Sequence, residues 1–148
     1  YERYRVNKRR CSRTYQYGLG SMLIDTHILL WFRFGDTRLD KDEIDKIISE
    51  GEKGNLCMSA ISVWEIAMLH KQQRITLHQP LEKWIQMATQ GIKVLPITTD
   101  IALESVNLPH FSHKDPADRM IIATARILGL ELLSKDQKII DYVNLGYL

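Results

Sequence analysis

The sequence predicts an α/β fold in three layers, with a mainly parallel central sheet flanked by helices. Short apolar runs alternate along the chain with longer amphipathic stretches, and capping or turn residues separate them. The chain has 148 residues, of which 45% are hydrophobic and 26% are charged. Because these proportions are ordinary for a globular domain of this length, we expect one domain with a sizeable core.

The first 21 residues differ from the rest of the chain. They are basic, rich in Tyr and Arg, and show no sustained period of 2 or 3.6 residues. Gly20-Ser21 before Met22 resembles a cloning junction, so we expect residues 1–21 to be a non-native tag or linker and residues 22–148 to form the domain. A native basic arm is the alternative.

Charge and cysteine content limit the possible environments. The leader holds six of the 20 basic residues and one of the 18 acidic ones, so residues 22–148 carry 14 basic and 17 acidic side chains. This mildly acidic body gives no bulk-charge support for nucleic-acid binding. Cys11 and Cys57 form no CxxC pair, which fits a reducing compartment. Apolar runs fall far short of the roughly 20 residues that a membrane span needs, so we expect a cytoplasmic protein.

The first half of the domain alternates between short strands and helices. The expected elements are a strand at 22–24, a helix at 27–34 capped by Thr26, a helix at 40–51, a strand at 56–58 and a helix at 59–72 capped by Ser59. Asp40 with Glu43 forms a capping-box pattern, and Gly51 is a typical helix end. The apolar stripe of the 59–72 helix is expected to consist of Ile61, Trp64 and Met68.

The second half continues the alternation. The expected elements are a helix from Pro80 to Gly91, a strand at 94–97, a helix capped by Thr99 that carries Leu103 and Val106, a helix from Asp115-Pro116 to Gly129, a strand at 130–133, a short helix near Ile139 and an edge strand at 145–148. In parallel sheets, ligands bind outside the carboxyl ends of the strands. That edge is therefore where chemistry is expected.

Carboxylates follow the predicted strands. Asp25 ends the first strand, Asp136 lies just past the 130–133 strand, and Asp118 is in the first turn of the helix before that strand. A fourth acid, Glu65, lies at the edge of the apolar stripe of its helix. A glutamate is costly there unless it is paired or binds a metal.

Converging carboxylates repel one another unless a cation neutralises them. All-oxygen sites suit Mg²⁺ or Mn²⁺, which can activate water for attack on a phosphodiester. Each acid also has a structural interpretation, as a helix cap, a turn residue or a partly solvated edge residue. Their coincidence at one sheet edge favours a single catalytic metal site, made of Asp25, Glu65, Asp118 and Asp136.

Four stretches resemble the motifs of VapC-type PIN-domain ribonucleases, in that family's order. They are residues 23–31, 59–67, 113–125 and 132–136, and the similarity covers nearly all of residues 22–148. The resemblance implies a PIN-like fold and Mg²⁺- or Mn²⁺-dependent endoribonuclease activity on RNA, with transfer RNA as one substrate class. It also implies a cognate antitoxin partner in a type II toxin–antitoxin system. The family's acids correspond to Asp25, Glu65, Asp118 and Asp136.

Residues beside the acids are candidates for supporting roles. Ser134 stands where the family usually has threonine and keeps the hydroxyl, so it is expected to help hold Asp136. Asp115 is expected to cap its helix, with an outer-shell role at the metal as the alternative. Arg119 is expected to contact phosphate or a neighbouring carboxylate. Three lysines flank the acids and are expected either to hold the RNA backbone or to be only solvated: Lys114, Lys135 and Lys138. We also expect a homodimer and no membrane partner.

Three other functions are known on similar folds. A DNA-directed nuclease of related fold usually carries more acids and added helical elements, both of which this short chain lacks. A signalling receiver domain needs a phosphoacceptor aspartate after the third strand, where this chain has Ile97-Thr98-Thr99. A non-catalytic binding module is disfavoured because all four acids are present.

Overall fold

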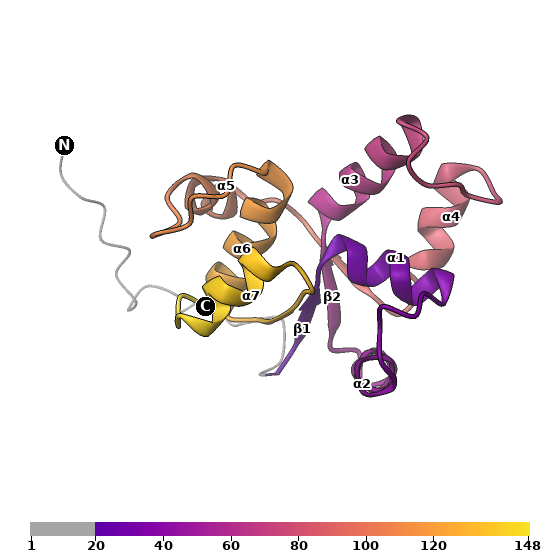
Figure 1. The fold of residues 1–148 in the computed structure, drawn as a ribbon, viewed down its shortest axis with the longest axis horizontal. Coiled ribbons are helices and arrows are strands. Elements are labelled where there is room, and N and C mark those ends of the chain that lie inside the picture. Colours follow the sequence, from indigo (N-terminus) through magenta and orange to yellow (C-terminus); the bar gives the residue numbers. More distant parts are fainter. Residues whose placement is uncertain (1–19) are drawn as a thin grey trace.

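The structure, a computed structural model, describes residues 20–148. The predicted leader therefore lies outside the described residues, except for Gly20 and Ser21. A four-stranded parallel sheet in the order β3-β2-β1-β4 separates two groups of helices (Figure 1). The elements are β1 (Met22–Ile24), α1 (Thr26–Phe34), α2 (Lys41–Glu52), β2 (Leu56–Ser59), α3 (Ala60–Lys71), α4 (Leu81–Ala88), β3 (Lys93–Leu95), α5 (Thr99–Val106), α6 (Pro116–Leu128), β4 (Glu131–Leu133) and α7 (Gln137–Asn144).

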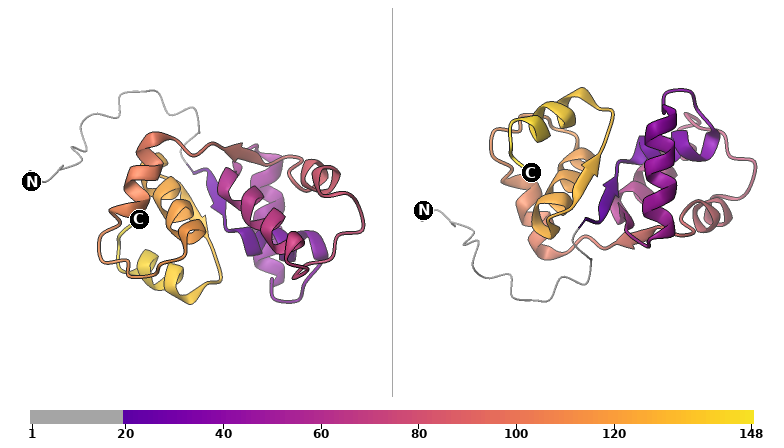
Figure 2. Two further views of the ribbon diagram at one scale, coloured as in Figure 1. Left: turned by 90° about the horizontal axis from the view of Figure 1, so that it is seen from above. Right: turned by 90° about the horizontal axis from the view of Figure 1, so that it is seen from below.

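Both faces of the sheet are covered, which explains why its central strands are apolar without alternation. Met22 and Ile24 belong to a core that α1, α2 and α3 complete, whereas Leu23 belongs to a core with Cys57 and the α6 residue Ile121. Figures 1 and 2 show α1 to α4 on one side of the sheet and α5 to α7 on the other. The predicted three-layer α/β fold is confirmed.

The strand register brings the carboxyl ends of three strands level. Ile24 at the end of β1 aligns with Met58 in β2 and with Leu133 at the end of β4. The amide of Asp25 then donates to the carbonyl of Leu133, at 3.0 Å. The residues that follow β1 and β4 are therefore neighbours in space.

The capping positions of two helices differ from prediction by one residue. Asp25, not Thr26, is the N-cap of α1, and its carboxylate accepts from the amide of Thr26. Thr98, not Thr99, caps α5. The Asp40–Glu43 capping box is confirmed, with both of its hydrogen bonds at 2.9 Å.

The predicted buried face of α3 was wrong. Trp64 is 53% exposed, and the buried residues are Ser62, Ile66 and Leu69. Apolar side chains occur on nearly every face of this helix, so their spacing did not identify the side that packs on the sheet. Glu65, next to Trp64, is half-buried.

The third strand and the C-terminus also depart from prediction. β3 is Lys93–Leu95, shifted toward the N-terminus from the expected 94–97. The strand expected at 145–148 is absent, because α7 runs to Asn144 and the residues after it form a turn. Within residues 20–148, no helix is both long enough and apolar enough to cross a bilayer.

Candidate active site at the carboxyl edge of the sheet

Asp25 is the most buried acid of the site, with 4% of its surface exposed. Its Oδ1 accepts from the amide of Thr26 at 2.6 Å, and its Oδ2 accepts from the Ser134 hydroxyl at 2.7 Å. Burial raises the pKa of Asp25, the hydrogen bond from Ser134 opposes that rise, and the charge of Asp136 adds to it. A buried carboxylate in this position gains from a nearby cation.

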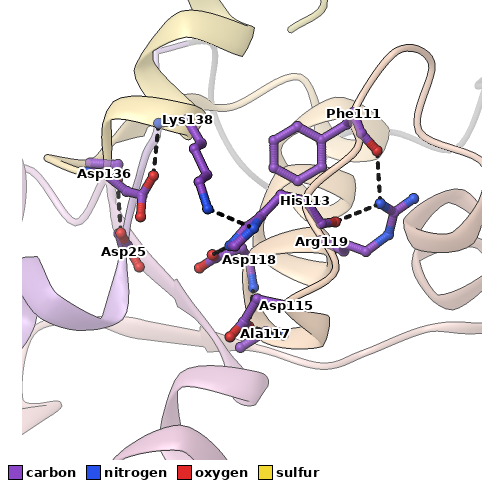
Figure 3. Close-up of polar contacts among 10 residues, drawn as sticks. Asp25, Phe111, His113, Asp115, Ala117, Asp118, Arg119, Asp136 and Lys138 are labelled. Carbon is purple, nitrogen blue, oxygen red and sulfur yellow. Dashed lines mark hydrogen bonds and ion pairs between the residues drawn. The ribbon is translucent and has the colours of Figure 1, made fainter.

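Ser134 connects Asp25 with Asp136. Its hydroxyl donates to Asp25 and accepts from the amide of Asp136 at 3.0 Å. Asp136 in turn caps α7, because its Oδ1 accepts from the amide of Lys138 at 2.8 Å (Figure 3). Ser134 therefore lies between the two acids, and its supporting role in the site stays a prediction.

Asp118 reaches the same edge from the first turn of α6. Asp115 caps that helix, accepting from the amides of Ala117 and Asp118 at 2.9 and 3.3 Å. The Asp118 carboxylate lies 2.8 Å from Nε2 of His113 (Figure 3). Burial, together with the charges of Asp115 and Asp25, raises the pKa of Asp118 to about 6, while the hydrogen bond with His113 opposes the rise.

Glu65 approaches from α3. Its Oε1 is buried and has no hydrogen-bond partner among residues 20–148. Burial raises the pKa of Glu65, the Thr26 hydroxyl and His27 oppose that rise, and the charges of Asp25 and Asp115 add to it. A buried carboxylate oxygen without a partner is costly unless something outside the chain supplies the contact.

The structure thus brings the predicted acids Asp25, Glu65, Asp118 and Asp136 to one edge, where their charges act on one another. As placed, no three His, Cys, Asp or Glu side chains within the described residues form a ready ligand set for an ion. Two of the acids are turned to protein partners instead, Asp25 to Ser134 and Asp118 to His113. The chemistry of the arrangement fits a divalent cation, because several carboxylates lie close together and the Glu65 Oε1 atom has no hydrogen-bond partner among the described residues. Binding would require the carboxylates to reorient.

Comparison with known proteins decides the family. The profile of the PIN domain matches residues 22–145. The chain belongs to the PIN-domain family. It is 34% identical over 119 residues to Ribonuclease VapC22 of Mycobacterium tuberculosis, a match that covers 80% of this chain and 89% of that protein. A chain from a structure described as a toxin–antitoxin complex from Klebsiella pneumoniae superposes with a TM-score of 0.58 at 26% identity, covering 86% of this chain and 94% of that one. The resemblance inferred from the motifs is confirmed.

Arg119 in this PIN domain does not lie where we expected it. Instead of facing a carboxylate or solvent, its guanidinium donates to four backbone carbonyls. They are the carbonyls of Ser105, Val106, Phe111 and His113, at 2.7 to 3.1 Å. Arg119 therefore fastens the segment between α5 and α6 to the start of α6.

The three lysines beside the site have different surroundings. Lys135 forms an ion pair with Glu43 of α2, at 2.9 Å. Lys138 points to His113, with Nζ 3.1 Å from Nδ1 (Figure 3). Lys114 is exposed. Lys114 and Lys138 line the same surface hollow as His113, whereas Lys135 is engaged elsewhere.

His113 is the residue that the sequence interpretation missed. It was part of a family-like stretch but received no role. It contacts both Asp118 and Lys138, and a neutral imidazole that accepts at Nδ1 and donates at Nε2 satisfies both contacts. A histidine two residues before a capping aspartate was the available indication. Its position depends on the path of the loop, which spacing alone does not reveal.

Proposed function

We propose that this PIN domain is a metal-dependent endoribonuclease and the toxin component of a type II toxin–antitoxin pair. The observation that carries the proposal is a set of three acids with raised pKa values, the buried Asp25 and the half-buried Glu65 and Asp118, in which one Glu65 oxygen is buried without a partner among the described residues. Carboxylates held in this way are typical of functional sites. The similarity to a protein named as a ribonuclease gives the reaction class.

The four acids Asp25, Glu65, Asp118 and Asp136 are the proposed ligands of Mg²⁺ or Mn²⁺. When bound, such an ion supplies a water activated for attack and offsets charge on the phosphodiester. The chain's own contribution is positioning. Ser134 and the Thr26 amide fix both oxygens of Asp25, and Asp115 holds the first turn of α6 that carries Asp118.

The same comparisons support two of the proposed partners. RNA is the proposed substrate, with transfer RNA as one candidate class, and an antitoxin protein is the proposed inhibitor because a structural neighbour comes from a toxin–antitoxin complex. A partner's arginine would suit the paired carboxylates at the site. The homodimer is also a proposal, for which the exposed Leu103 and Val106 of α5 offer an apolar contact surface.

Cleavage of a labelled single-stranded RNA tests the proposal. We expect cleavage with Mg²⁺ or Mn²⁺, none with excess EDTA, and recovery when the ion is restored. A single-stranded DNA of the same sequence should be cut far more slowly. Cleavage that resists EDTA would overturn the metal role, and equal rates on DNA would favour the DNA-directed alternative. Binding of RNA without cleavage under any ion would indicate a non-catalytic module.

A further inference from the structure

A hollow of about 500 Å³ lies beside the acidic edge. It is formed by the segment from His110 to Lys114, which precedes α6, and by α7 with the turn after it. We call it the His113 hollow. Its size is within the roughly 300–1,000 Å³ typical of small-ligand sites. None of the four proposed metal ligands lines it.

The rim of the His113 hollow is mainly basic. Its basic character comes from two lysines, Lys114 and Lys138, against one acid, Asp141, among its lining residues. Asp141 already accepts from Gln137, at 2.7 Å. The adjoining edge of the sheet is acidic, so the polarity changes sign over a short distance. An RNA strand that is cleaved at the acidic edge would need cations nearby to hold its phosphates, and the basic hollow supplies them.

A direct chain of contacts joins the hollow to the acids. Lys138 contacts Nδ1 of His113, and Nε2 of His113 contacts Asp118 (Figure 3). His113 is held in place from behind, because its carbonyl and that of Phe111 accept from Arg119, each at 2.9 Å. One residue that lines the hollow, His113, is therefore in direct contact with a proposed metal ligand, Asp118.

The wall of the hollow is apolar. Phe111 and Tyr142 pack edge to face with their ring centroids 4.9 Å apart, and both are buried. Leu145, in the turn after α7, lines the same hollow and is 71% exposed. A ligand with an apolar face would remove the Leu145 side chain from water, which is favourable, and an anionic group on the same ligand would be attracted by the lysines.

We infer that the His113 hollow binds one nucleotide of the RNA, adjacent to the phosphate that is cut. Its phosphate lies against Lys114 and Lys138, and its ribose or base covers Leu145 and the edge of Phe111. This inference rests on the proposed ribonuclease function and adds a subsite to it. An acidic segment of a protein partner would also meet the basic rim, but it would leave the apolar wall without a matching face.

Single-turnover cleavage of a ten-nucleotide RNA tests the subsite, with the half-saturating protein concentration and the maximal rate measured separately. Leu145→Glu places a negative charge in the hollow without touching the acids or His113. We expect it to raise the half-saturating concentration about tenfold or more and to leave the maximal rate within about threefold. Lys114→Ala should weaken binding and lower the salt dependence by about one phosphate contact.

Ile48→Glu is the matched control. Ile48 is 46% exposed on α2, on the other side of the sheet, and undergoes the same change of charge. Its half-saturating concentration should equal that of the parent protein. The subsite is refuted if Leu145→Glu and Lys114→Ala both have the half-saturating concentration of Ile48→Glu. The ribonuclease function still stands in that case, provided that the parent protein cleaves RNA. If both variants saturate normally but lose a co-expressed protein partner, the hollow binds that partner instead. A parent without RNA cleavage would overturn both proposals.

Discussion

Two aspartates in this domain occupy the N-cap of a helix but differ in their hydrogen bonds and in their surroundings. Asp40 caps α2 at the surface, where its carboxylate accepts from the amide of Glu43 in a complete capping box. Asp25 caps α1 with an equally direct bond to the amide of Thr26, but it is almost fully buried and burial raises its pKa. Capping therefore does not distinguish a structural acid from a functional one.

The difference comes from the sheet. Asp25 directly follows β1, whose register with β4 places Ser134 and Asp136 beside it. Asp40 follows a loop, and its partners are local. Of these two caps, only the one that lies where parallel strands end together has other acids beside it, and such strand ends are where ligands bind in parallel sheets. Substitutions that act on one aspartate and spare the other test this distinction.

The largest effect is expected from Asp25→Asn. The amide keeps the size and the capping ability of the side chain but removes the charge that attracts a cation. We expect RNA cleavage to fall by more than about a hundredfold, with a cooperative unfolding transition retained. The matched change Asp40→Asn should leave the cleavage rate within about twofold. Near-normal cleavage by folded Asp25→Asn would remove Asp25 from the site.

The next effect is expected from Glu65→Gln. Loss of the charge should lower cleavage by roughly 10- to 100-fold. The folded state raises the pKa of Glu65 through burial, so at neutral pH its ionised form is penalised on folding, and this penalty lessens as the pH falls. The metal-free Glu65→Gln protein should therefore melt at the same temperature as the parent or higher. Thermal melts in EDTA measure this, and a clear loss of stability would make Glu65 structural.

The sequence was sufficient for the fold class and for the convergence of the acids. Strand ends are visible as apolar runs, so Asp25 and Asp136 could be assigned to the sheet edge from position alone. The buried face of α3 could not be predicted, because Ser62 faces inward through its hydrogen bond with Thr26 and Trp64 faces out. That bond joins residues 36 positions apart, and the spacing of apolar residues within one helix holds no information about such a long-range contact.

The surroundings of His113 were unpredictable for a related reason. The segment between α5 and α6 has no repeating pattern, and its path depends on four carbonyls gathered by one guanidinium. From the sequence we expected Arg119 to contact phosphate or a neighbouring carboxylate, whereas the structure shows that it donates to backbone carbonyls. The path of this loop could not be predicted, because one side chain organises it through contacts that no sequence period reports.

A smaller effect, on stability, is expected from adding metal. Mg²⁺ or Mn²⁺ that binds the folded state raises the melting temperature in a concentration-dependent way. The parent and Asp40→Asn should show the same increase, whereas Asp25→Asn should show little or none. An equal increase in all three proteins would mean that the ion binds away from the carboxyl edge.

The smallest effect is expected from Asp40→Ala. This change removes the side-chain bond to the amide of Glu43 while the Glu43 carboxylate can still accept from the backbone of residue 40. Loss of an N-cap costs about 1 kcal/mol in the free energy of unfolding, which urea titration resolves. Cleavage by the folded protein should stay within about twofold of the parent, because the ion pair between Glu43 and Lys135 does not require the Asp40 carboxylate. A loss of activity as large as that of Asp25→Asn would show that α2 belongs to the site and that the contrast between the two caps does not hold.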